Sequence, residues 1–263
     1  MIPNTIHFIF GLRKDFGSKP FSFFNYLAVK SAYDCNHPNE IKFYYKYKPK
    51  GKWWEKSKKY LTLIKVEPPT EIFGNKLIHY AHQSDILRYQ ILMKEGGIYL
   101  DMDVICLNSF KPILKYDCVM GKEGNYGLCN AVMLVKAKSR FLKKIYDTYH
   151  DFKSGEWGKH SVVLPLKLAN LYPDYIHVED RCSFFWPLYN NPAPLWKIRS
   201  AKVSEKNKYR DKLEEIILSQ SYCMHLWNKL WWDPFLKNLS PESIKRGNTL
   251  FAKLCLRFLD SSK

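Results

Sequence analysis

The sequence lacks a long apolar run and a recognisable export signal. No stretch reaches the ~18–20 uninterrupted apolar residues that a membrane-spanning helix needs. The first apolar run meets Arg13, Lys14 and Asp15 directly after Gly11 and Leu12, without the small-residue cleavage site of a signal peptide. These absences predict a protein that is made and kept in the cytoplasm.

The seven cysteines include no Cys-x-x-Cys pair and are scattered along the chain. Their odd number and irregular spacing argue against a disulfide framework, and the missing pair argues against a zinc knuckle. We therefore expect reduced, mostly buried thiols.

Acidic residues are scarce, because 25 Asp and Glu stand against 42 Lys and Arg, a formal net charge of +17. Such a surplus suits a polyanionic neighbour, and nucleic acid, anionic lipid and sugar nucleotides all qualify. Residues 42–60 interleave lysines with tyrosines and tryptophans, which could form a stacking groove for a single nucleic-acid strand. We favour the alternative, a pair of strands with aromatic inner faces and solvated lysines, and expect no nucleic-acid partner.

Alternating helical and extended patterns predict an α/β fold. The 263 residues, 46% of them hydrophobic, suffice for one large domain or two small ones. Strands are expected near residues 3–11, 41–47, 98–106 and 131–135, and helices near 21–33, 84–95, 139–152 and 161–170. We assign residues 1–240 to one catalytic domain and residues 241–263 to a basic amphipathic C-terminal tail. The tail could bind an anionic membrane surface. Docking of the tail on the domain is an alternative to which we give equal weight.

Asp101 and Asp103 are the main candidates for chemistry. On a strand, residues i and i+2 point to one side about 6–7 Å apart, at the strand end where nucleotides bind in open α/β sheets. Two carboxylates there are costly unless a divalent cation neutralises them. A solvated pair of aspartates is the alternative for a bare Asp-x-Asp.

A polar helix face precedes this pair. Ser84, Asp85 and Arg88 lie on adjoining parts of one face. A guanidinium suits phosphate or sugar hydroxyls, and a nearby carboxylate can orient it. An ordinary helix salt bridge is the alternative.

Together these residues resemble the core of the retaining glycosyltransferases with a DXD sugar-binding region, of the family thirty-two type. Nearest is the α-1,4-galactosyltransferase and N-acetylglucosaminyltransferase branch. The resemblance rests on residues 82–103, which include Gly96-Gly97-Ile98-Tyr99 and Asp101-Met102-Asp103. Residues 224–228 are similar to the C-terminal histidine block of that branch, and residues 6–10 to the family's first strand.

The resemblance implies a GT-A type fold, a Rossmann-like nucleotide-binding sheet with flanking helices, and a UDP-sugar donor. It implies that Mn²⁺ or Mg²⁺ is held by Asp103, Asp101 and His225, although His225 could also be a core histidine. Imidazole with carboxylates suits manganese better than calcium. The implied catalytic residues are Asp101, Asp103 and Arg88. The donor-binding residues are expected to be His7, Phe8, Phe10, Ser84, Asp85, Arg88, Tyr99, Asp101 and Asn130, with a turn role as the alternative for Asn130.

We therefore predict a metal-dependent retaining glycosyltransferase. It would move galactose, glucose or an N-acetylhexosamine from a UDP-sugar to a glycan or glycolipid, in bacterial lipooligosaccharide or capsule synthesis at the inner face of a membrane. The alternatives are a nucleic-acid-binding protein that uses residues 42–60 and a metal-dependent phosphodiesterase. No enzymic nucleophile is assigned, because neither Glu123 nor Asp117 stands out.

Overall fold

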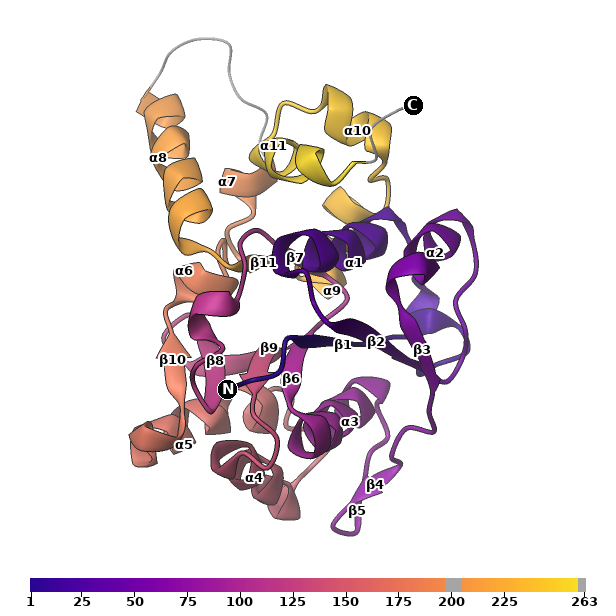
Figure 1. The fold of residues 1–263 in the computed structure, drawn as a ribbon, viewed down its shortest axis with the longest axis vertical. Helices are drawn as coiled ribbons and strands as arrows, with labels where there is room; N and C mark the ends of the chain where they lie inside the picture. Colours follow the sequence, from indigo (N-terminus) through magenta and orange to yellow (C-terminus); the bar gives the residue numbers. More distant parts are fainter. Residues whose placement is uncertain (197–204, 260–263) are drawn as a thin grey trace.

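The computed structural model describes residues 1–196 and 205–259 and contains a seven-stranded sheet with helices on both faces (Figure 1). The large sheet consists of β1 Thr5–Ile9, β2 Glu40–Tyr45, β3 Thr62–Lys65, β6 Gly97–Leu100, β8 Cys118–Glu123, β9 Gly127–Val135 and β10 His177–Glu179. Two small sheets pair β4 Glu71–Ile72 with β5 Asn75–Lys76, and β7 Val104–Cys106 with β11 Cys223–His225. The helices are α1 Phe23–Asn36, α2 Lys52–Ser57, α3 Tyr80–Glu95, α4 Arg140–Asp147, α5 Leu164–Leu171, α6 Arg181–Phe184, α7 Ala193–Trp196, α8 Glu205–Gln220, α9 Asn228–Trp231, α10 Pro241–Arg246 and α11 Leu250–Cys255.

The strand order in the large sheet is β10-β8-β9-β6-β1-β2-β3. Strands β6, β1, β2 and β3 run parallel, and β9 runs antiparallel to its neighbours β6 and β8. The predicted α/β class is confirmed. Helix α3 begins at Tyr80, before the expected Ser84, because His79 caps it by accepting the backbone N–H of Ala81 at 3.1 Å.

Both faces of the sheet are buried. Along β6, Ile98 and Leu100 belong to the core on the α1 side, whereas Tyr99 belongs to the core on the α3 side. Figure 1 shows α1, α10 and α11 above the strands and α3 and α4 below them. Each fully buried apolar side chain contributes roughly 1.5–3 kcal/mol, so the strands are held from both sides.

The prediction of one continuous strand over residues 98–106 is wrong. Strand β6 ends at Leu100, and a turn follows in which Val104 N–H donates to the Asp101 carbonyl at 3.0 Å. The amide of Asn25 donates to the Met102 carbonyl at 2.9 Å and fixes this turn to α1. Strand β7 then leaves the large sheet and pairs antiparallel with β11. Asp101 and Asp103 therefore lie on a turn, not on a strand.

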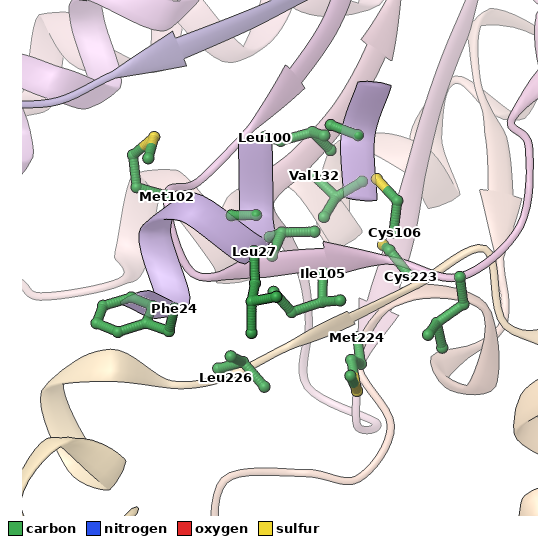
Figure 2. Close-up of a cluster of buried hydrophobic side chains, with 14 of the residues drawn as sticks. Phe24, Leu27, Leu100, Met102, Ile105, Cys106, Val132, Cys223, Met224 and Leu226 are labelled. Carbon is green, nitrogen blue, oxygen red and sulfur yellow. The ribbon is translucent and has the colours of Figure 1, made fainter. Parts of the chain in front are cut away.

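An apolar cluster lies beneath this turn (Figure 2). Phe24 and Leu27 of α1 meet Ile105 of β7 and Met224 of β11 within one buried core. The side chain of Met102 belongs to the same core and is only 7% exposed. Burial of this central residue anchors the turn between the two aspartates.

The turn that leads into β6 depends on glycine. Gly96 and Gly97 have φ angles of 69° and 110°, which favour residues without a Cβ. A Cβ on Gly97 would lie 2.5 Å from Nε2 of His7, so a side chain there would displace the histidine. The predicted end of the helix at this pair is confirmed.

Residues 42–60 do not form the expected pair of strands. They comprise most of β2, a loop, α2 and a short 3-10 turn over Lys58–Tyr60. Tyr44 and Trp54 are buried in the core, while Lys52 and Lys56 are exposed. The buried rings are thus unavailable for stacking against a nucleic-acid strand.

The C-terminal tail packs against the domain. Leu250, Phe251, Leu254 and Phe258 are buried in the core that also contains α1, and Phe251 stacks on Trp196 with ring centroids 4.3 Å apart. The docked arrangement leaves these apolar side chains inside the protein. Within residues 1–196 and 205–259, none of the helices has the length and apolar character needed to cross a bilayer.

Candidate active site

The turn and the β7–β11 pair bring together the three predicted metal ligands. One potential ligand atom from each of Asp101, Asp103 and His225 lies within 4.8 Å of the others. Nε2 of His225 lies 3.3 Å from Oδ1 of Asp103. The antiparallel register, which places His225 opposite Val104, produces this approach.

The donor set fits a divalent cation. Two carboxylates and one imidazole are ligands that Mn²⁺ and Mg²⁺ accept, with the nitrogen favouring the transition metal. Nδ1 of His225 and Oδ1 of Asn228 are both buried without a hydrogen-bond partner in the described residues. Unsatisfied polar atoms beside two carboxylates are expected where a ligand completes the site.

The charged groups of this cluster shift one another's pKa values. Burial raises the pKa of Asp101, although the nearby Arg88 opposes this effect. Burial also opposes ionisation of Asp103, but His225 and the N–H of Asn228 together hold the pKa of Asp103 below its usual value. Burial disfavours the charged imidazole, yet Asp103 raises the pKa of His225. A cation would therefore compete with a proton at His225.

Arg88 connects the cluster to the polar face of α3. Its Nη1 donates to the Asn130 carbonyl at 2.7 Å, and its Nη2 lies 3.2 Å from Asp101 Oδ1 and 3.3 Å from Asp85 Oδ1. Its guanidinium also lies 4.3 Å from the centroid of the Tyr99 ring. The buried guanidinium thus sets the positions of two carboxylates.

Asn130 completes this network from β9. Its amide donates to Asp85 Oδ1 and to the Tyr89 hydroxyl, both at 2.9 Å. Burial raises the pKa of Asp85 to about 6, while Arg88 and Asn130 partly offset this effect. A pre-built network of this kind can bind hydroxyl groups without rearranging.

Two cavities meet at the aspartates, with volumes of about 460 Å³ and 570 Å³. Both volumes lie in the range of small-molecule sites. The first cavity is lined by the chain after β1, including Phe10, and by Ser84. The second is lined by Asp85 and Asn130. Shared lining residues are Ala81, Arg88, Asp101, Asp103, Trp157, Asn228 and Lys229.

Two lysines that the sequence analysis missed line the first cavity. Lys19 Nζ donates to the Asn228 carbonyl at 3.0 Å, and burial lowers its pKa while Asp103 opposes that shift. Lys229 Nζ lies 4.9 Å from the centroid of the Trp157 ring. Lysines are abundant in this chain, so the sequence gives no reason to assign either lysine to the site. Trp157, 59% exposed, was missed as well.

Three predicted donor-binding residues do not line either cavity. His7 and Phe8 are completely buried, since His7 Nε2 lies 2.9 Å from the Gly96 carbonyl and Phe8 belongs to the apolar core. Tyr99 is only 1% exposed, and its hydroxyl donates to Asp101 Oδ1 at 2.7 Å. These side chains can hold neighbouring residues in position, but they do not contact the space that a ligand would occupy.

Comparison with known proteins shows which family the chain belongs to. The model of the family "Glycosyltransferase sugar-binding region containing DXD motif" matches residues 15–120. Glucan organizing enzyme 1 of Cryptococcus neoformans is 32% identical over 98% of this chain and 71% of its own length. The mouse lactosylceramide 4-alpha-galactosyltransferase is 26% identical over 56% of this chain and 40% of its own length. The solved galactosyltransferase LgtC, in complex with donor and acceptor sugar analogs, aligns over 98% of both chains with 15% identity and a TM-score of 0.44. The chain therefore belongs to the family of glycosyltransferases whose sugar-binding region contains a DXD motif.

Proposed function

We propose that this glycosyltransferase moves a hexose from a UDP-sugar to a hydroxyl group of a glycan or glycolipid, with retention of configuration. The observation that supports the proposal is the convergence of Asp101, Asp103 and His225 where two cavities meet. A donor that spans both cavities would place its diphosphate at this junction.

The first cavity suits the nucleoside diphosphate. It lies at the carboxyl end of β1, where nucleotides bind in α/β sheets, and Lys19 and Lys229 give it positive charge. The second cavity suits the hexose, because Asp85 and Asn130 present hydrogen-bonding groups there and Arg88 lies between the two spaces. Each part of the donor thus has chemically matching side chains.

Asp101, Asp103 and His225 would hold Mn²⁺ or Mg²⁺, which acts as a Lewis acid towards the charge on the leaving diphosphate. The chain's own cations add to this stabilisation. Lys19 lines the first cavity and Lys229 lines both, and the buried Arg88 is held by its hydrogen bond to the Asn130 carbonyl. Preorganised charge of this kind needs no reorganisation during the reaction.

The acceptor is proposed from the names of the relatives, one of which acts on a lactosylceramide and one of which concerns glucan. Both relatives are eukaryotic, so the bacterial pathway expected from composition forms no part of the proposal. Residence in the cytoplasm at the inner face of a membrane stays a prediction, supported by the charge of +17.

A panel of nucleotide sugars tests the donor and the metal together. UDP-sugars with Mn²⁺ should raise the melting temperature by about 5–10 °C at saturating concentrations, since ligand at 100 times its Kd adds about 2.7 kcal/mol. GDP- and ADP-sugars should give smaller shifts, and EDTA should remove the effect. Equal shifts without a metal would contradict the metal role, and shifts with GDP-sugars alone would contradict the proposed donor.

Product analysis then separates transfer from hydrolysis. A glycosyltransferase releases UDP faster when an acceptor is added and forms a new glycoside. A phosphodiesterase consumes the donor at the same rate with or without an acceptor.

A further inference from the structure

The second cavity contains a carboxylate that the donor site does not use. Glu123 is the last residue of β8, opposite Gly127 of β9, and it is only 7% exposed. It lines the second cavity together with Tyr126, whose hydroxyl donates to Glu123 Oε1. The same cavity is lined by Asp101, Asp103 and His225, so Glu123 shares it with the candidate metal ligands.

Glu123 differs from two carboxylates that lie next to strands β8 and β10. Asp117 and Asp180 are largely exposed and form ion pairs with Lys136 and Lys122 at 3.3 and 3.2 Å. Within the described part of the chain, Glu123 forms no ion pair with a lysine or arginine. A buried carboxylate without a cation costs several kcal/mol, which a ligand that donates hydrogen bonds would offset.

Aromatic side chains accompany this carboxylate. Trp227 lines the same cavity, and its indole is fixed by donation to the Pro187 carbonyl at 3.2 Å. Tyr126, 47% exposed, lies at the cavity as well. A sugar ring has hydroxyl donors around its edge and apolar C–H faces, so it matches a carboxylate flanked by aromatic rings. Pockets of this composition combine apolar area with a few orienting polar groups.

We propose that Glu123 binds the acceptor sugar by accepting hydrogen bonds from its hydroxyl groups, with the C–H face of the ring against Trp227 and Tyr126. Tyr126 is in addition a positioning residue, because its hydroxyl holds the carboxylate. The substrate class is a sugar that is uncharged at this position, since Glu123 repels a phosphate or carboxylate group. This inference rests on the proposed glycosyl transfer and deepens it.

The test compares Glu123→Gln and Tyr126→Phe with the wild type, using methyl glycosides and a methyl glucuronide as acceptor probes. Charged hydrogen bonds contribute about 1.5–3 kcal/mol, so Glu123→Gln should raise the acceptor KM about 10–100-fold. The KM for the UDP-sugar and its manganese-dependent thermal shift should stay within twofold of wild type. Tyr126→Phe should raise the acceptor KM less. The wild type should have a higher kcat/KM for the methyl glycosides than for the methyl glucuronide. Glu123→Gln should reduce the ratio of these two values.

Asp117→Asn is the matched control, because it makes the same chemical change at an exposed carboxylate outside both cavities. An unchanged acceptor KM in Glu123→Gln, or equal rises in the donor and acceptor KM, would overturn the inference. If Glu123→Gln does not fold, Tyr126→Phe tests the inference instead. Its acceptor KM should rise without an equal rise in its donor KM. Binding of a UDP-sugar with no glycoside accepted would refute the sugar acceptor alone. Absence of any manganese-dependent donor binding would refute the proposed function itself.

Discussion

The carboxylate of Asp103 accepts the backbone N–H of Asn228 through Oδ2 at 2.7 Å. Its other oxygen, Oδ1, lies 3.3 Å from Nε2 of His225. The orientation of the carboxylate is therefore set by the protein before a cation binds. A preset ligand position of this kind favours affinity because little freedom is lost on binding.

Asp103→Asn should reduce transfer at least 100-fold, because an amide replaces an anionic ligand for the metal. The N–H of Asn228 can still donate to the amide oxygen, so the fold should persist. Transfer assays and manganese titration by calorimetry measure both effects. Asp117→Asn should behave as wild type, and more than a few per cent of residual transfer in Asp103→Asn would falsify the ligand assignment.

Arg88→Lys should impair transfer more than binding of UDP. Lysine keeps the positive charge but cannot reach Asn130, Asp101 and Asp85 together. The kcat/KM should therefore fall about 10–100-fold, which corresponds to a loss of ~1.4–2.7 kcal/mol of transition-state stabilisation. Steady-state kinetics and UDP calorimetry provide the comparison. Arg140→Lys is the control, because Arg140 is exposed and lies 4.1 Å from the Tyr175 ring centroid. Equal losses of transfer and of UDP binding would show that Arg88 acts mainly in binding the nucleotide.

His7 should make the stability of the protein depend on pH. Burial lowers its pKa from 6.5 to about 4. The unfolded chain then binds a proton more readily, so stability present above pH 6.5 is lost as the pH falls towards 4. The expected loss from this group is about 3 kcal/mol at full protonation.

Urea unfolding at pH 7, 5.5 and 4.5 measures this dependence. His7→Gln should be less stable at pH 7, because the contacts with Gly96 and Tyr44 change, yet it should lose less stability on acidification. The control His37→Asn alters an exposed residue with a φ of 41°, a conformation that asparagine tolerates. A pH profile of His7→Gln parallel to that of wild type would exclude the role of His7.

Phe251→Ala should destabilise the protein by about 3–5 kcal/mol, the usual cost of removing a buried phenylalanine side chain. Phe251 is 1% exposed and stacks on Trp196. Leu256→Ala should change stability by less than about 0.5 kcal/mol, because Leu256 is 51% exposed. Similar melting temperatures for the two variants would show that the tail is not part of the core.

The α/β class follows from local patterns in the sequence. The Asp-x-Asp motif and the family resemblance single out Asp101, Asp103 and His225, and the fold brings these three side chains together. The sequence-based prediction failed between Leu100 and Val104, where alternation favoured a continuous strand. The contact that bends the chain there, from Asn25 to Met102, joins residues 77 positions apart. Periodicity within a short window contains no information about such a contact.

Buried aromatic and histidine residues were misplaced for a related reason. The resemblance to the family's first strand predicts that His7 and Phe8 bind the donor, yet both side chains are completely buried. Lys19 and Lys229 were missed because a chain with 42 basic residues gives no reason to single out two. Only the folded chain shows which of these side chains reach the cavities.

The pairing of β7 with β11 also determines when the site can exist during synthesis. Asn228, which holds Asp103, follows it by 125 residues. At about 5–20 residues per second, the ribosome delivers this partner roughly 6–25 s after the aspartate. Until then the nascent chain carries both aspartates without His225. An unfinished polypeptide that ends before His225 thus cannot assemble the three-residue cluster.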